Sequence, residues 1–143
     1  MITTKQHGFT MIELLVAATI LAVLATIGVV SFRSAAIRAR DGKRQADLSQ
    51  VRSGLELWRS APGNTRYPNT NYEGVLTSLG AGSYLSEPYP RDPKNDATYF
   101  YQYAATNAQA GYCLCARLES GGGNSSTSSC SFGTGNFYCL RNP

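Results

Sequence analysis

A single carboxylate, Glu13, lies inside the most apolar stretch of this 143-residue chain. The stretch runs from Phe9 to Val30 and holds 17 apolar residues in 22, with Glu13 as its only charged side chain. A helix needs about 20 apolar residues to cross the roughly 30 Å hydrocarbon core of a bilayer. A carboxylate inside such a span costs about 2.5–3.5 kcal/mol on insertion scales, so we expect it to have a function and a cationic partner. Snorkelling of Glu13 to the lipid headgroups is the alternative, because the residue lies near the start of the span.

The residues around Glu13 resemble the processing site of type IV pilins and of the pseudopilins of type II secretion. From Lys5 onward the sequence reads KQHGFTMIELLV. In that family a prepilin peptidase cuts after the glycine that ends a short basic leader. It then methylates the new N-terminal amine, usually of phenylalanine, and a glutamate falls at the fifth position of the processed chain. Gly8, Phe9 and Glu13 match these three positions, so the resemblance implies residues 1–8 as a leader peptide and Gly8–Phe9 as the processing site.

Cleavage after Gly8 would create an ammonium group at Phe9, close in sequence to Glu13. An opposite charge within hydrogen-bonding distance stabilises a buried carboxylate. The resemblance implies a homo-oligomeric helical filament, in which we expect Glu13 of one subunit to meet the Phe9 amine of its neighbour and fix the register of the helices. A secretory signal peptide with a cleavage site at residues 34–36 and a plain membrane anchor are the alternative interpretations of the span.

The charges that flank the span conflict with the resemblance. Five basic residues follow the span whereas Lys5 precedes it, which would place the C-terminal side in the cytoplasm. A leader that is cut by the peptidase must face the cytoplasm, so we expect one pass through the inner membrane with the C-terminal head outside. After assembly the chain would lie in an extracellular pilus or a periplasmic pseudopilus. The five residues are Arg33, Arg38, Arg40, Lys43 and Arg44.

These basic residues are expected to meet lipid headgroups before assembly and acidic neighbours such as Asp41 and Asp47 afterwards. Their cluster contains no interleaved aromatic residues, and the net charge of +4 is modest. Both features disfavour nucleic acid as a partner. The partners that we expect are further copies of the chain, the prepilin peptidase, a membrane assembly platform and, before assembly, the lipid bilayer.

Four cysteines lie beyond position 112, which indicates an oxidising compartment for this half of the chain. Cys113 and Cys115 are two residues apart in a predicted strand, so they share a face and do not easily bond to each other. We expect each to pair with Cys130 or Cys139, and the sequence leaves both pairings open. A zinc site is the alternative, but C-x-C followed by C-x8-C is poor spacing for it. We therefore predict no metal and no cofactor.

The chain offers little for catalysis. Its single histidine, His7, lies in the predicted leader, and the sequence contains no recognisable nucleophile motif or convergent carboxylate pair. Charged residues make up 15% of the chain, below the usual proportion of about 25%. We predict a structural subunit and no enzyme. A pilin of a type IV pilus-like filament is preferred, a pseudopilin of a type II secretion system is the alternative, and a DNA-uptake or adhesive minor pilin is less favoured.

Helical spacing continues past the apolar span. An apolar stripe recurs at intervals of three and four residues, no proline interrupts residues 9–61, and Pro62-Gly63 is a stop signal. We expect one helix over this range, with residues 9–31 as the transmembrane or filament-core segment and residues 32–61 as an amphipathic continuation. The stripe consists of Leu48, Val51, Leu55 and Trp58.

Residues 62–143 are predicted to form a globular head. Its first part, residues 62–97, is a loop region with a short helix around Tyr72–Leu79, and residues 98–143 hold the sheet and the cysteines. Together with the helix stripe, the strands predict an α+β fold in which a long N-terminal helix packs on a small antiparallel sheet, which is the type IV pilin architecture. The strand-like runs are 98–103, 111–118 and 136–140.

The middle of the chain also resembles major pseudopilins and their pilin relatives. Major pseudopilins usually carry an acidic C-terminal loop that binds calcium, whereas Glu119 is the one carboxylate beyond Asp96 in this chain. This departure favours a pilus subunit. Asp92, Asn95 and Asp96 offer oxygen ligands instead, but a turn explains them more simply. The matching segments are RYP at 66–68, YL at 84–85, PRDP at 90–93 and YQY at 101–103.

Residues 121–129 are rich in glycine and serine and are predicted to form a flexible surface loop. Within them, Asn124-Ser125-Ser126 fits a glycosylation sequon, for which a chance match is the simpler explanation.

Overall fold

The computed structural model describes residues 8–125, 130, 132–133 and 135–142, so leader residues 1–7 lie outside the described residues. The chain divides into two compact units, the first of which ends at Ala36 and the second of which begins at Ile37. The first helix contributes to both units. The α+β class predicted from the sequence is confirmed. The elements are α1 (Met11–Ser60), α2 (Tyr72–Ala81), β1 (Tyr101–Thr106), the 3-10 helix η1 (Asn107–Gln109), β2 (Gly111–Arg117) and β3 (Phe137–Arg141).

Helix α1 begins two residues later than the sequence predicted, because Thr10 acts as its N-cap. The Thr10 Oγ1 accepts a hydrogen bond from the Glu13 backbone N–H at 3.3 Å, and the Thr10 carbonyl accepts from the Leu14 N–H at 3.2 Å. The helix continues without interruption to Ser60 and ends just before Pro62. Its uninterrupted length follows from the absence of proline between these two ends.

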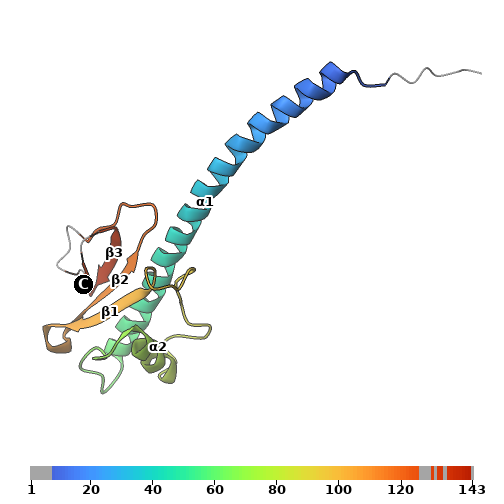
Figure 1. The fold of residues 1–143 in the computed structure, drawn as a ribbon. Helices are drawn as coiled ribbons and strands as arrows, with labels where there is room; N and C mark the ends of the chain where they lie inside the picture. The colour runs from blue at the N-terminus through green and yellow to red at the C-terminus, as the bar shows by residue number, and fades with distance from the viewer. Residues whose placement is uncertain (1–7, 126–129, 131, 134, 143) are drawn as a thin grey trace, which may run out of the picture. The chain divides into compact units, whose positions relative to one another are not determined.

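The core of the head forms where the C-terminal half of α1 meets α2 and the sheet (Figure 1). The predicted stripe residues Leu48, Val51 and Leu55 are fully buried, because their spacing places them on one helix face. Trp58 packs at the edge of this core, with its ring edge-on to Tyr84 at 5.8 Å between centroids. The other elements contribute Val75, Leu76 and Leu79 from α2, and Tyr101, Tyr103, Tyr112, Leu114 and Ala116 from the sheet.

The sheet is an antiparallel meander in the order β1-β2-β3. The first strand begins three residues later than predicted, because the Asp96 carboxylate accepts the backbone N–H groups of Thr98 and Tyr99 at 2.8 Å each and closes a turn there. In β2, Leu114 faces the core with Tyr103, its partner in β1, whereas the cysteines occupy the opposite face. The sheet therefore has one face for α1 and one for the disulfides.

Buried tyrosines attach the sheet and the loop after α1 to acidic residues of α1. The Tyr101 hydroxyl donates to Asp47 at 2.7 Å, so Asp47 serves a tyrosine and not one of the basic residues for which it was predicted. Tyr112 and Tyr67 donate to the two oxygens of Glu56, at 2.9 and 3.1 Å. Burial and the nearby Glu56 charge raise the pKa of Tyr67 to about 12. These hydroxyls let large rings fill the core without leaving a polar atom unpaired.

Candidate functional site

The bond between Gly8 and Phe9 lies in exposed, non-helical backbone just before α1. The Phe9 side chain is 79% exposed, and a Cβ atom added to Gly8 would meet no other atom within 4 Å. Exposed backbone without regular structure is the kind of segment that proteases cut most readily. The segment predicted as a processing site therefore has the accessibility that cleavage requires.

Glu13 lies in the first turn of α1 and is exposed. Together with Thr10 it forms the T-x-x-E spacing of a capping box, and a carboxylate in this turn interacts favourably with the helix dipole. This capping role was missed in the sequence, although the spacing signals it. Among the described residues, none of the ion pairs includes Glu13. Its charge is therefore available to a group outside the subunit.

The N-terminal part of α1 is apolar on all sides. An 18-residue window of this helix has a mean hydropathy of 2.5 and no buried residue, so α1 is long and apolar enough to cross a membrane. The hydroxyls of Thr19 and Thr26 donate to the carbonyls of Val16 and Val23, at 2.8 and 2.7 Å, which satisfies both hydroxyls inside the helix. A helix with no polar face needs lipid or other apolar helices around it. This property fits a membrane-anchored precursor.

A buried cluster of charges holds α1 to two loops of the head. The guanidinium of Arg44 is fully buried and donates twice to Asp92, at 2.7 and 3.0 Å. It also donates to Asp41 at 2.7 Å and to Glu119 at 2.8 Å. Burial alone would lower the pKa of Arg44, but the hydrogen bonds to Asp92, Glu119 and Asp41 outweigh it and raise the pKa. Arg44 is therefore a permanent cation at the centre of three carboxylates.

The carboxylates of this cluster have further partners. Glu119 accepts two hydrogen bonds from Arg40, at 2.8 and 2.7 Å, and pairs with Lys94 at 2.9 Å. The hydrogen bonds from Arg40, Lys94 and Arg44 hold the pKa of Glu119 well below its usual range. Asp41 accepts from the Ser120 hydroxyl at 2.6 Å and from two backbone N–H groups. The three cations and three carboxylates balance one another, and together they form a closed network.

This network bears on the roles predicted for the basic residues after the apolar span and for Asp92. Arg40 and Arg44 were predicted to meet lipid headgroups before assembly and acidic neighbours such as Asp41 afterwards. Arg44 does pair with Asp41, but it is fully buried, and both arginines are bound to carboxylates of their own head. Asp92, considered as a calcium ligand, instead accepts two hydrogen bonds from Arg44 and closes a turn by accepting the backbone N–H groups of Lys94 and Asn95, at 2.9 and 3.4 Å. The remaining basic residues of this region, Arg33, Arg38 and Lys43, are exposed.

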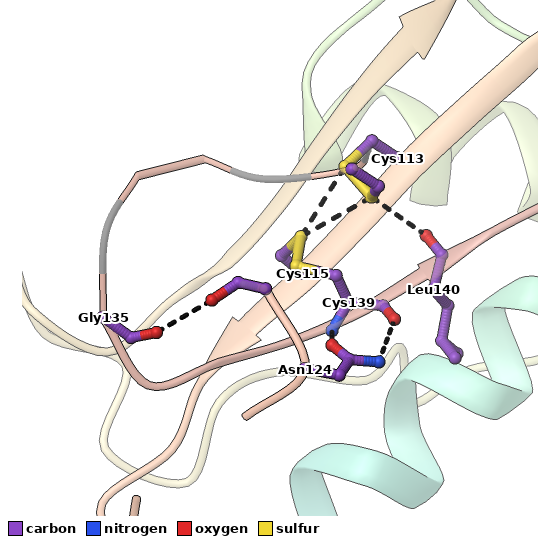
Figure 2. Close-up of a disulfide and its surroundings, with 8 residues drawn as sticks. Cys113, Cys115, Asn124, Gly135, Cys139 and Leu140 are labelled. Atoms are coloured by element: carbon purple, nitrogen blue, oxygen red, sulfur yellow. Dashed lines mark hydrogen bonds between the residues drawn. A yellow bond between two sulfur atoms is a disulfide. The ribbon is translucent and has the colours of Figure 1, made fainter. Parts of the chain in front are cut away.

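The four cysteines form two neighbouring disulfides on the face of the sheet that does not contact α1. Cys113 is bonded to Cys130 and Cys115 to Cys139 (Figure 2). The Cys113 and Cys115 sulfurs lie 3.7 Å apart without a bond between them, as expected for two cysteines on one face of a strand. The bridges therefore attach β3 and Cys130 to the central strand, β2.

The described part of the glycine- and serine-rich loop, residues 121–125, packs on β3. Asn124 accepts the Cys139 N–H at 2.6 Å and donates its amide nitrogen to the Cys139 carbonyl at 2.9 Å, so it pairs with the edge of β3 as a neighbouring strand would (Figure 2). A Cβ atom on Gly123 would collide with the Phe137 backbone, which explains the glycine. A glycan on Asn124 would break its bond to Cys139. Residues 126–129 of this loop lie outside the described residues.

Removal of the bridge between Cys115 and Cys139, by replacing both with alanine, should lower the free energy of unfolding of the head by about 2–4 kcal/mol. The bridge closes a loop between residues that are 24 apart, and its loss frees the unfolded chain. Thermal unfolding of the full chain in detergent, followed by the fluorescence of Trp58, the chain's single tryptophan, measures the change. Four free thiols in protein purified from outside the cell without reductant would refute the arrangement.

Comparisons with known proteins match both the N-terminus and a larger part of the chain. Residues 3–29 match the prokaryotic N-terminal methylation motif. The chain is 30% identical over 92 residues to the type II secretion system core protein G of Dickeya chrysanthemi, and 31% identical over 90 residues to the protein of the same name from Pectobacterium carotovorum subsp. carotovorum. These matches cover 64% and 62% of this chain but 54% and 56% of the relatives, so the chain spans about half of their length. No solved structure matches the chain.

The matched motif includes Gly8, Phe9 and Glu13 and extends into the apolar part of α1. The fold agrees with it, because a long helix with an exposed apolar N-terminal part precedes a small antiparallel sheet. Taken together, these observations show that the chain contains the prokaryotic N-terminal methylation motif and that it is similar to two type II secretion system core proteins G.

Proposed function

We propose that this chain is the structural subunit of a type IV pilus-like filament, that prepilin peptidase cleaves it after Gly8, and that it polymerises through α1. The observation that carries the proposal is the N-terminal part of α1, which is apolar and exposed on all sides and has one charged residue, Glu13, in its first turn. Such a helix is stable in a bilayer, and equally so among identical helices in the core of a filament.

The charge and the new N-terminus are the two polar groups that the assembled helices must accommodate. Cleavage after Gly8 would give Phe9 an ammonium group, and Glu13 has no ionic partner among the described residues of its own chain. Away from water, an ion pair between Glu13 and the Phe9 amine of a neighbouring subunit would be strong, and mispaired registers would leave a charge unpaired. We propose that this pair sets the axial register of the filament.

We propose no catalytic role for the chain. His7 would leave with the leader peptide. The carboxylates that lie together in the head, Asp41, Asp92 and Glu119, are held by Arg44 and its neighbours in a network that lowers their pKa values. Permanently ionised carboxylates with full sets of hydrogen-bond donors are poor general acids, because proton transfer at neutral pH needs a pKa near the operating pH.

A secretion pseudopilus is the second candidate, because both relatives described above are core proteins of type II secretion systems. The lack of an acidic C-terminal loop, which binds calcium in most major pseudopilins, favours the first candidate. Glu119 is the one side-chain carboxylate beyond Asp96, and it is already bound to Arg40 and Lys94. Electron microscopy and mass spectrometry of filaments sheared from the cell surface separate the two candidates. Surface filaments built mainly of this chain support a pilus, and filaments confined to the periplasm support a pseudopilus. Absence of the chain from filaments in both compartments would overturn the proposal.

The mature chain should begin at Phe9 with a methylated amine, and the intact mass of the native protein tests this directly. Replacement of Gly8 with leucine should block cleavage, because a bulky side chain beside the bond hinders the close approach of the peptidase to the backbone. Thr10→Ala is the matched control, since it changes a residue two positions away and should be cleaved normally. A native N-terminus at Met1, or one that follows Ala36, would contradict the prediction.

A further inference from the structure

The head contains a cavity of about 370 Å³ that the filament proposal does not use. It lies beside β1, and its walls come from the start of α2, the loop around residues 91–95, the strand itself and Phe132. Its volume lies within the range of roughly 300–1,000 Å³ that small-molecule sites occupy. Phe100, which directly precedes β1 and lines the cavity, is 43% exposed and offers a ring to a ligand.

The charged groups around this cavity are already neutralised. Glu73 is paired with Arg91 at 2.9 Å, and Asp92 is held by the buried Arg44 at 2.7 Å. An anion or a cation that entered the cavity would therefore find no unpaired opposite charge there and would lose its hydration. The walls favour a neutral ligand.

The cavity offers rings and one acceptor that lacks a donor. The Tyr72, Tyr101 and Tyr103 hydroxyls donate to Pro90, Asp47 and Pro68 respectively, so these three lining residues have no free hydroxyl for a ligand. Among the described residues, the Oε1 of Gln102 is the one buried side-chain polar atom without a hydrogen-bond partner. A buried unpaired acceptor is costly, and a turn of the Gln102 amide toward the cavity would let a ligand O–H or N–H satisfy it.

We propose that this cavity binds a neutral sugar, with the pyranose ring against Phe100 and a hydroxyl donating to Gln102. A pyranose has the combination that the walls require, namely an apolar C–H face for an aromatic ring, hydroxyl donors and no charge. Asn71 adds an amide at the rim, because its Oδ1 caps α2 at Gly74 while its nitrogen has no partner among the described residues. Sugar binding would give the head a recognition function that does not depend on α1 or on filament assembly.

Ligand-observed saturation-transfer NMR tests the proposal with the full chain in a detergent that has no sugar headgroup. The probes are the methyl glycosides of glucose, galactose, mannose, N-acetylglucosamine and N-acetylgalactosamine, with N-acetyltyrosine amide as a non-sugar probe. We expect at least one glycoside to bind. Gln102→Leu should weaken that binding about tenfold through loss of the acceptor, and Phe100→Ala should weaken it about fivefold through loss of the ring.

Leu57→Ala is the matched control, because Leu57 is an exposed apolar residue of α1 that does not line the cavity. It should bind the glycoside as the parent does. The melting temperature of Gln102→Leu, followed by Trp58 fluorescence, should equal or exceed that of the parent, which shows that lost binding is not lost folding. The proposal is overturned if no glycoside binds, if binding survives both cavity variants, or if the tyrosine amide binds and the glycosides do not.

Discussion

Replacement of Glu13 with alanine should abolish filament assembly while the protein still inserts in the membrane and is still cleaved after Gly8. The change removes a charge from an apolar helix, so insertion should be as good as before or better. In the filament it would leave the Phe9 amine of a neighbouring subunit without its partner. Loss of one member of a buried ion pair costs about 3–5 kcal/mol, enough to suppress the addition of each subunit. Counts of surface filaments, with immunoblots of membrane levels, measure the effect.

Thr10→Ala separates assembly from helix capping. Thr10 caps the same turn, and its loss removes a hydrogen bond worth about 1 kcal/mol while Glu13 keeps its charge. This variant should assemble, and Glu13→Gln, which keeps the shape of the side chain without the charge, should not. Normal filament numbers with Glu13→Ala, or equal defects in Thr10→Ala and Glu13→Ala, would show that Glu13 serves only as a capping or snorkelling residue.

Replacement of Arg44 with methionine should destabilise the head by about 3–5 kcal/mol, because it leaves the fully buried side chain of Asp92 without its cation. The melting temperature followed by Trp58 fluorescence should fall by more than about 10 °C. Arg40→Met is the matched control. Arg40 is partly exposed and bonds to Glu119 alone, and Glu119 would keep Lys94 and Arg44, so this loss should be much smaller. Equal melting temperatures for the parent and the Arg44 variant would refute the central position of Arg44.

The acid sensitivity of the head gives a second readout of the same cluster. The folded-state pKa values of Asp41, Asp92 and Glu119 lie below their usual range, so their contribution to stability is complete above the unfolded pKa of about 4 and is lost as the pH falls below it. The parent should therefore lose stability steadily as the pH is lowered from about 5. The Arg44→Met variant should show a flatter acid dependence, because Asp92 has lost the hydrogen bonds from Arg44 that hold its pKa down against the effect of burial.

The helices and strands could be predicted from the sequence, because the spacing of nearby apolar residues and the positions of prolines determine where they form. The spacing of Leu48, Val51 and Leu55 defines the buried face of α1, and the position of Pro62 sets its end. The first strand was placed three residues too early, because the aromatic run from Tyr99 onward has strong strand propensity. The Asp96 carboxylate overrides this propensity, because it accepts the Tyr99 N–H and closes a turn there.

The charge cluster and the cysteine pairing could not be predicted, because both depend on contacts between distant residues. Arg44 is 48 residues from Asp92 and 75 from Glu119. In the sequence it stands among five similar basic residues, and nothing local distinguishes the buried Arg44 from the exposed Lys43 beside it. The two possible pairings of Cys113 and Cys115 have similar loop lengths, so only the path of the chain after β2 decides between them.

A cryo-electron microscopy reconstruction of native filaments, at a resolution that shows side chains, would test the assembly mechanism most directly. The mechanism predicts that every subunit begins at Phe9, and that the Glu13 carboxylate lies about 2.7–2.9 Å from the Phe9 amine of a neighbouring subunit, the distance of a charge-assisted hydrogen bond. A Glu13 carboxylate that faces water, or that contacts only its own chain at Thr10, would contradict it.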